Sequence, residues 1–297
     1  MNIMVTGSCG QLGYDVMQKL SNGIYNVIGT DIKEKSCFKN YIKMDITNFL
    51  EVKNVLDYIK PDIIIHCAAW TAVDLAEDED NKDKVYNLNV NGTKNLVSYC
   101  AKSNCKFVYI STDYVFEGRG ELPWEPDNKE YSPINYYGFT KLEGEKIVSK
   151  LLNKYFIIRI AWVFGLNGNN FVKTMISLAN KGIKELRVVD DQIGTPTYTY
   201  DLAQLLADMI QTDKYGYYHA TNEGGFISWA DFAEEIFKQT NQEVLIKRVS
   251  TEEYGISSAR RPLNSRLDKK KLIEKGFNPL PEWKDALRRF LIEIGEI

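Results

Sequence analysis

A tyrosine and a lysine stand four residues apart in PINYYGFTKLEGEK, which runs from Pro133 to Lys146. Residues i and i+4 share one face of a helix, so Tyr137 and Lys141 are expected to lie one turn apart. Tyr136 is five residues from the lysine and points well round the cylinder. A tyrosine beside a cation can donate a proton to a carbonyl that is being reduced. The same pattern also occurs as a tyrosine packed on a lysine stem, so the assignment depends on a cofactor site nearby.

A glycine-rich turn near the start of the chain offers that cofactor site. The segment MVTGSCGQLG places Gly7, Gly10 and Gly13 between an apolar run and an amphipathic stretch. Glycines there allow a tight turn and a close backbone approach to a pyrophosphate, which the first N–H groups of the next helix stabilise. The spacing predicts a dinucleotide-binding loop; the alternative is an ordinary glycine-rich turn.

A carboxylate beyond the glycines bears on which dinucleotide is bound. Asp31 ends the next apolar run, where it can accept hydrogen bonds from ribose hydroxyls and would repel a 2′-phosphate. NADH is therefore favoured over NADPH. Lys33 and Lys35 follow closely and can offset the repulsion, so both NADH and NADPH stay candidates.

The elements that position these residues alternate regularly through the first half of the chain. Buried strands are expected at NIMVTG, YNVIGTD, YIKMD, DIIIHCAA, KFVYIST and YFIIRIAWVFG, and helices at QLGYDVMQKLS, FLEVKNVLDYI and NGTKNLVSYCAKS. Near-continuous apolar strands that alternate with helices predict a parallel sheet covered on both faces. The expected fold is a doubly wound (Rossmann) α/β sheet.

After about residue 165 the alternation becomes less regular. We expect residues 1–160 to form a dinucleotide-binding Rossmann domain. Residues 161–297 are expected to form mainly a smaller, partly interleaved α/β substrate-binding lobe, with some segments returning to the first domain. Ser228 is a predicted N-cap for the helix in SWADFAEEIFKQ. Strands are expected at KELRVVDD, YGYYHAT and VLIKRVS.

Composition excludes several classes of protein. The net charge of −3 argues against a nucleic-acid binder. No run of about 18 apolar residues is present, so we expect no membrane span, and the N-terminus lacks the pattern of a signal peptide. The five cysteines form no C-x-x-C pair, which favours a reducing cytoplasm over a disulfide scaffold or zinc site. The two histidines, His66 and His219, offer no His-rich metal site, and His66 is expected to be a packed strand residue.

Thr112, at the end of the strand KFVYIST, would present a hydroxyl at the carboxyl edge of the sheet, beside Tyr137. The glycine pattern, Thr112 and the Tyr137–Lys141 pair resemble the extended short-chain dehydrogenase/reductase family. The resemblance extends over almost the whole chain, through GQLG, AAWTAVDLAEDE, STDYVF, YYGFTKLEGE, WVFG, NFV, VVDDQIGTPT, DLA and RPLNSRLD.

The resemblance implies hydride transfer from the nicotinamide to C4 of a 4-keto nucleotide sugar, dTDP-4-dehydro-L-rhamnose, for surface polysaccharide precursors. Tyr137 would donate the proton, Lys141 would lower the pKa of Tyr137 and hold the nicotinamide ribose, and Thr112 would hydrogen-bond the substrate carbonyl. Asp113, Trp162 and Tyr137 carry over as substrate contacts, and Arg261 in RRP is a candidate for the substrate pyrophosphate. The residues that carry over as cofactor contacts are Gly10, Gln11, Leu12, Asp31, Asp45, Ile46, Ala68, Ala69, Trp70, Ile110 and Lys141. Asp45 could instead cap the helix that follows it.

Relatives with other activities define the alternatives. Sugar-nucleotide dehydratases carry Asp-Glu after the threonine, whereas Asp113 here is followed by Tyr114, which favours simple reduction. Reduction of another 4-keto nucleotide sugar stays open, as does a non-catalytic, NAD(P)-binding subunit resembling the regulatory subunit of methionine adenosyltransferase. Some members dimerise through magnesium held by glutamates, but Asp15 and Tyr200 stand near two of those positions, so no metal is predicted. The expected assembly is a monomer or homodimer.

Overall fold

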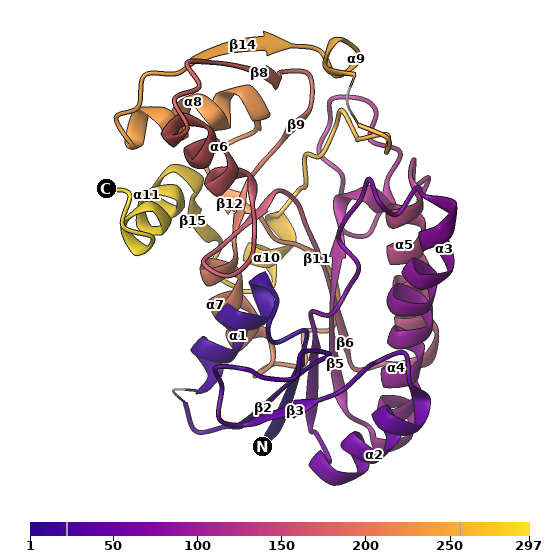
Figure 1. Ribbon diagram of the computed structural model, residues 1–297. Coiled ribbons are helices and arrows are strands. Elements are labelled where there is room, and N and C mark those ends of the chain that lie inside the picture. Colours follow the sequence, from indigo (N-terminus) through magenta and orange to yellow (C-terminus); the bar gives the residue numbers. More distant parts are fainter. Residues whose placement is uncertain (22, 256) are drawn as a thin grey trace.

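A seven-stranded, all-parallel sheet forms the centre of the computed structural model, which describes residues 1–21, 23–255 and 257–297 (Figure 1). The strand order is β11-β6-β5-β4-β1-β2-β3. The strands are β1 (Asn2–Thr6), β2 (Asn26–Asp31), β3 (Tyr41–Lys43), β4 (Ile63–His66), β5 (Lys106–Thr112), β6 (Tyr155–Ile160) and β11 (Gly216–His219). The expected Rossmann fold is confirmed.

Helices cover both faces of this sheet because its strands carry apolar side chains on both sides. Ile3 and Val5 of β1 pack against α1 (Gln11–Ser21) and α7 (Thr199–Met209). Met4, between them, points to the opposite face, where α2 (Phe49–Ile59), α4 (Thr93–Ser103) and α5 (Tyr136–Leu151) lie (Figure 1). A short helix α3 (Glu79–Tyr86) and a π-helical turn η1 (Asn87–Gly92) lead into α4.

The predicted strand YFIIRIAWVFG is interrupted, which corrects one expectation. β6 ends at Ile160, and a two-residue strand β7 (Val163–Phe164) follows and pairs with β10 (Thr197–Tyr198) instead. Trp162 lies between them with a φ of 52°, in the left-handed region that a bulky residue adopts only under constraint. The chain therefore leaves the central sheet at this residue.

The second half of the chain builds a smaller packed unit, drawn from dark red through orange to yellow in Figure 1. Its core consists of apolar faces of α6 (Phe171–Asn180), α8 (Trp229–Gln239) and α11 (Trp283–Glu293). Strands β8 (Glu185–Val189) and β14 (Leu245–Val249) pair in parallel beside them. The smaller elements are a 3₁₀ turn η2 (Asp113–Val115), β9 (Ile193–Gly194), β12 (Asn222–Glu223), β13 (Ile227–Ser228), α9 (Thr251–Tyr254), α10 (Lys270–Glu274) and β15 (Leu280–Glu282).

Three local expectations for this half are confirmed. Ser228 caps α8, with a reciprocal bond from the Ser228 backbone to Asp231. The segments KELRVVDD and VLIKRVS form β8 and β14. YGYYHAT forms β11, which pairs with β6 at the edge of the central sheet. Within the described ranges, no helix combines the length and the apolar character needed to cross a membrane.

Candidate active site

The start of α5 determines which tyrosine faces the sheet. Asn135 caps the helix by accepting a hydrogen bond from the Gly138 N–H at 2.8 Å, and Glu77 accepts one from the Tyr136 N–H at 2.7 Å. A Cβ at position 138 would lie 2.3 Å from the Tyr114 carbonyl oxygen. The helix can approach η2 this closely only because residue 138 is glycine, and that approach brings Tyr137 to the end of β5.

The two neighbouring tyrosines have different surroundings. Tyr137 packs edge-on against Tyr114, with ring centroids 5.8 Å apart, and hydrogen-bonds with Thr112. Tyr136 packs on Phe139 and has the Lys82 ammonium over its ring, away from the sheet. The structure therefore brings Tyr137, and not Tyr136, together with Thr112.

Burial has the largest effect on the pKa of Tyr137 and raises it above its ordinary value, and the Asp113 carboxylate raises it further. The hydrogen bond with Thr112 acts in the opposite direction. The phenol consequently stays protonated at neutral pH. A neutral phenol at this position has a proton to give. The prediction that Lys141 lowers this pKa is wrong, because burial and the Asp113 carboxylate raise it and the opposing effect comes from Thr112.

Lys141 is almost completely buried one turn further along α5, with 3% of its surface exposed. Its Nζ lies 4.1 Å from the centroid of the Tyr109 ring. Burial lowers its pKa to about 7, while the negative charge of Glu145 acts in the opposite direction. Lys141 can therefore change its charge close to neutral pH, which an exposed lysine does not do.

Thr112 ends β5 and Asp113 begins η2, and together they connect the two halves of the molecule. The Thr112 hydroxyl donates to Asp113 Oδ1 at 2.9 Å and accepts from the Tyr114 N–H at 3.2 Å. The other Asp113 carboxylate oxygen accepts a hydrogen bond from Ser265. Burial raises the pKa of Asp113 to about 6, against the lowering effect of these two hydroxyls. Thr112 is thus held in place beside Tyr137, and its hydroxyl must rotate to donate elsewhere.

The glycine loop adjoins a groove of about 170 Å³ at the carboxyl ends of β1, β2 and β4. Six predicted cofactor residues line it, namely Gly7, Gly10, Asp31, Ile46, Ala68 and Ala69. Five lining residues were not predicted: Thr30, Ile32, Met44, Cys67 and Leu88. Thr30, Ile32, Met44 and Cys67 each adjoin a predicted residue, so strand ends were the available signal for these four. Leu88 lies in η1 and had no such signal.

The glycines let the loop, α1 and the sheet approach one another closely, as a dinucleotide-binding site requires. Gly7 has a φ of 65°, and a Cβ there would lie 2.6 Å from the Ala68 nitrogen. A Cβ on Gly13 would lie 2.1 Å from the Gly7 carbonyl oxygen. These positions keep α1 and the loop against the sheet, so that backbone N–H groups face the groove.

Several other predicted cofactor residues do not line this groove. Asp45 accepts hydrogen bonds from the Thr47 backbone and hydroxyl at 2.9 and 2.8 Å, so it caps the turn before α2. Gln11 is bonded to Asn170 and to the Val163 carbonyl. The remaining five are Leu12 and Ile110, which are buried in the core, Gly13, Trp70, whose indole N–H donates to the Ala72 carbonyl, and Lys141 of α5.

Asp31 has both carboxylate oxygens engaged by the protein. The Cys9 N–H donates to Oδ2 at 3.1 Å and the Lys33 N–H donates to Oδ1 at 3.3 Å. The Lys33 ammonium also lies 3.4 Å from the Cys9 carbonyl oxygen. A second hollow beside this loop is lined by Lys33, Lys35 and Ser36, among others. Positive charge therefore lies next to the carboxylate that was expected to repel a 2′-phosphate.

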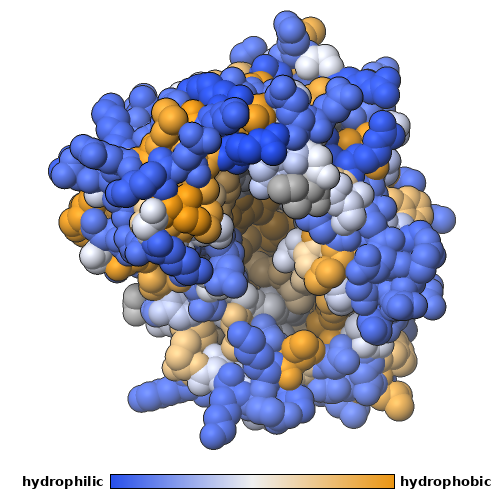
Figure 2. Space-filling model, turned by 45° about the horizontal axis from the view of Figure 1, so that its top comes forward, coloured by the Kyte–Doolittle hydropathy of each residue, from blue (hydrophilic) through white to orange (hydrophobic). Residues whose placement is uncertain are grey.

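The predicted substrate residues Trp162 and Arg261 come from the second half of the chain or its junction with the first. Trp162 stacks on Trp229, with ring centroids 3.9 Å apart and planes at 17°. Arg261 forms two hydrogen bonds to Asp74, at 2.6 and 3.1 Å, across 187 residues of sequence. On the face shown in Figure 2, the molecule is hollowed at its centre, and hydrophobic residues form part of the hollow's wall.

Comparisons with known proteins agree over almost the full length of the chain. The family model described as the RmlD substrate binding domain matches residues 1–295. The chain is 39% identical over 301 residues to the dTDP-4-dehydrorhamnose reductase of Aggregatibacter actinomycetemcomitans, covering 96% of this chain and 97% of that protein. It is 38% identical over 291 residues to the spore coat polysaccharide biosynthesis protein SpsK of Bacillus subtilis (strain 168), covering 98% and 97%. The crystal structure of dTDP-4-dehydrorhamnose reductase from Bacillus anthracis str. Ames in complex with NADP superposes with a TM-score of 0.90 at 42% identity, covering 98% and 99%.

Proposed function

We infer the activity from one premise, which is that this chain belongs to the RmlD substrate binding domain family. We propose that it is an NAD(P)H-dependent oxidoreductase that reduces the C4 keto group of dTDP-4-dehydro-L-rhamnose to give dTDP-L-rhamnose. The observation that carries the proposal is the contact of Tyr137 with Thr112 at the carboxyl edge of the sheet, beside the glycine loop. Lys141 lies one turn further along α5, with its ammonium over the Tyr109 ring of β5. The names of its relatives supply the substrate.

The proposed chemistry divides the work between three side chains. When bound, NAD(P)H supplies the hydride. Tyr137 gives its proton to the carbonyl oxygen as negative charge develops there. The Thr112 hydroxyl turns from Asp113 towards that oxygen and stabilises the charge. The Lys141 ammonium would stabilise the phenolate left on Tyr137 and would also hold the nicotinamide ribose.

Other residues would hold the two ligands. Gly7, Gly10 and the first N–H groups of α1 would carry the pyrophosphate of the cofactor, and Asp31 would lie at the adenosine ribose. Asp113 and Trp162 are proposed substrate contacts, and Arg261 is proposed for the substrate pyrophosphate. This assigns cofactor binding to residues 1–160 and substrate binding mainly to 161–297, in a protein proposed to act in the cytoplasm.

The test of this function is to mix purified protein with dTDP-4-dehydro-L-rhamnose and either NADH or NADPH. Oxidation of the cofactor is monitored as the loss of its absorbance. Rapid oxidation with this substrate is the expected result. Oxidation only with a different 4-keto nucleotide sugar would replace the rhamnose assignment. A protein that binds the cofactor but oxidises it with no such sugar would have the non-catalytic, regulatory role instead.

The rate of reduction is expected to fall as the pH rises above about 7. The pKa of Lys141 is lowered to about 7, so the lysine is mainly an ammonium below that pH and mainly neutral above it. Tyr137 contributes nothing to this fall, because its pKa is raised above its ordinary value. The measurement is kcat/KM from about pH 6 to about pH 9. A profile that stays flat over this range would show that Lys141 does not control the rate through its charge.

Removing the two lysines beside Asp31 is expected to affect NADPH and not NADH. Lys33 and Lys35 line the hollow next to the ribose end of the groove, where they would pair with a 2′-phosphate. The variant Lys33→Ala/Lys35→Ala should raise KM for NADPH by about tenfold, since exposed ion pairs each contribute about 0.2 to 1 kcal/mol. KM for NADH should stay within about twofold. Lys39→Ala, an exposed lysine that does not line the hollow, is the matched control; equal effects on both cofactors would contradict the assignment.

A further inference from the structure

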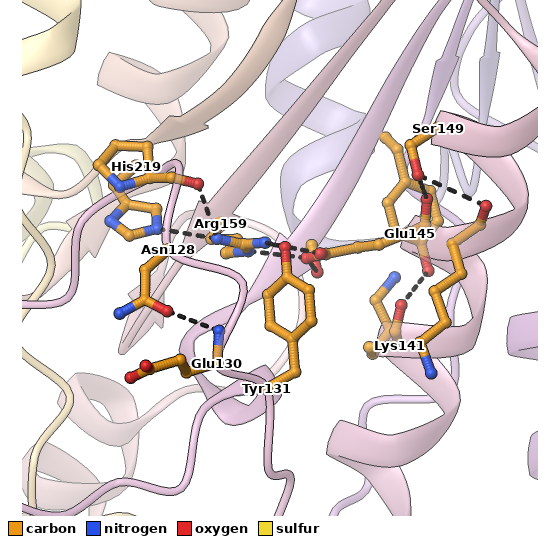
Figure 3. Close-up of polar contacts among 12 residues, drawn as sticks. Asn128, Glu130, Tyr131, Lys141, Glu145, Ser149, Arg159 and His219 are labelled. Carbon is orange, nitrogen blue, oxygen red and sulfur yellow. Dashed lines mark hydrogen bonds and ion pairs between the residues drawn. The ribbon is translucent and has the colours of Figure 1, made fainter.

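A buried ion pair joins α5, the helix that carries Tyr137 and Lys141, to β6 of the central sheet (Figure 3). Glu145 of α5 and Arg159 of β6 have side chains that are 1% and 0% exposed, and Arg159 Nη2 lies 2.8 Å from Glu145 Oε2. Arg159 Nε donates to the other carboxylate oxygen at 2.9 Å, so the pair is bidentate. The Ser111 hydroxyl donates to that same oxygen at 2.5 Å. Ser111 immediately precedes Thr112, so one carboxylate touches the strand that carries a catalytic residue.

Every N–H group of the Arg159 guanidinium has an acceptor. Besides Glu145, it donates to the Pro126 carbonyl at 3.1 Å and to the Tyr131 hydroxyl at 2.9 Å, and its Nη1 lies 3.4 Å from His219 Nε2. His219 is neutral, because burial and Arg159 lower its pKa well below the ordinary value. The guanidinium is therefore fixed in place, and so is the carboxylate that it holds.

Stability alone does not account for an ion pair at this depth. Taking two charges out of water costs several kcal/mol for each ion, and apolar side chains of similar volume often stabilise a core as well or better. A buried pair is accordingly weak support for a stabilising role. What distinguishes this pair is its position, because Glu145 follows Lys141 by four residues and shares its helix face.

Among the described groups around Lys141, Glu145 is the carboxylate that acts on its ammonium. At the end of β4, burial lowers the pKa of His66 to about 3 and raises that of Cys67 to about 12, so both are neutral near pH 7. On β5, burial raises the pKa of Tyr109 well above its ordinary value. Tyr137, on α5 itself, is also a neutral phenol. Asp113, after β5, acts on Tyr137 and does not appear among the groups that change the pKa of Lys141.

We propose that Glu145 is a positioning residue for the reaction: its carboxylate keeps the Lys141 side chain an ammonium, and Arg159 holds that carboxylate in place while limiting how strongly it acts. The proposal rests on the proposed reductase function, in which the Lys141 ammonium stabilises the Tyr137 phenolate. In this proposal the Glu145–Arg159 pair contacts neither the cofactor nor the substrate. It sets the pH range over which the enzyme is active.

The test is the pKa of Lys141 in variants that change one member of the pair. Glu145→Gln keeps the shape and removes the charge, so the pKa of Lys141 should fall by about one unit, the effect of a single neighbouring charge. Arg159→Met removes the opposing cation, so the pKa should rise. NMR of ¹³Cε-labelled lysine, assigned with Lys141→Met, gives these values in the protein without substrate. The alkaline limb of the pH profile of kcat/KM should move to lower pH in Glu145→Gln and to higher pH in Arg159→Met.

Two controls separate charge from structure. Glu143→Gln removes a partly exposed carboxylate that pairs with Lys146 on another face of α5, and Ser111→Ala removes a hydrogen bond but no charge. Both should leave the pKa of Lys141 unchanged. The proposal is overturned if Glu145→Gln leaves that pKa in place, or if Glu145→Gln and Arg159→Met move it in the same direction. If Glu145→Gln fails to fold, the rise expected for Arg159→Met decides alone. An inactive wild-type protein would refute the reductase function and leave the NMR test intact.

Discussion

Replacing Tyr137 by Phe is expected to lower kcat for sugar reduction by about 10²- to 10⁴-fold, the range that general acid catalysis contributes. Phe lacks the hydroxyl that gives the proton. The other described side chain bonded to Thr112 is Asp113, which does not occupy the position of the Tyr137 hydroxyl. The ring itself remains, so its edge-on contact with Tyr114, at 5.8 Å between centroids, is retained. Cofactor affinity should therefore stay within about twofold of wild type.

Tyr136→Phe is the matched control for that experiment, because it removes the same atom from the neighbouring residue. Tyr136 lies under Lys82 and beside Phe139, away from Thr112. The turnover of the Tyr136→Phe variant should therefore stay within about twofold of wild type. Both variants are measured by oxidation of NADPH and by a fluorescence titration with the cofactor. Equal losses in the two variants would mean that the face of α5 presented to the substrate has been assigned wrongly.

Replacing Gly13 by Ala is expected to weaken binding of the reduced cofactor by about 10- to 100-fold. The new Cβ would lie 2.1 Å from the Gly7 carbonyl oxygen and 2.9 Å from the Ser8 Cα, both backbone atoms that cannot move aside cheaply. Relief requires α1 to move away from the loop, which costs about 1–3 kcal/mol and withdraws its N–H groups from the pyrophosphate. Fluorescence titration with NADPH measures the affinity, and thermal unfolding measures the loss of stability.

Gly23→Ala is the control for this variant. A Cβ at Gly23 would meet its nearest atom at 3.5 Å, an ordinary contact, so cofactor affinity and stability should be nearly unchanged. If Gly13→Ala bound NADPH as tightly as wild type, the glycine loop would not be the site that carries the pyrophosphate. Lost stability with retained affinity would restrict Gly13 to a packing role.

Local sequence patterns predicted the fold well because they reflect local physics. The runs NIMVTG and KFVYIST are apolar on both faces, which suits only a strand covered on both sides, and they became β1 and β5. Ser228 was recognisable as an N-cap since its partner, Asp231, lies within the same turn of chain. The left-handed turn at Trp162 was not predictable in this way. Its stacking on Trp229, 67 positions further along the chain, depends on contacts between distant segments.

The sequence by itself determined the parallel sheet, the glycine turn, and the placing of Tyr137 and Lys141 on one helix face, because each follows from the spacing of neighbouring residues. It also determined the family, through motifs spread over the whole chain. Only the tertiary structure decided which charges surround these residues. Asp31 became bonded to the loop at Cys9, Arg261 to Asp74, and Glu145 to Arg159. Burial lowers the pKa of Lys141 to about 7, and burial depends on how separate elements pack against one another.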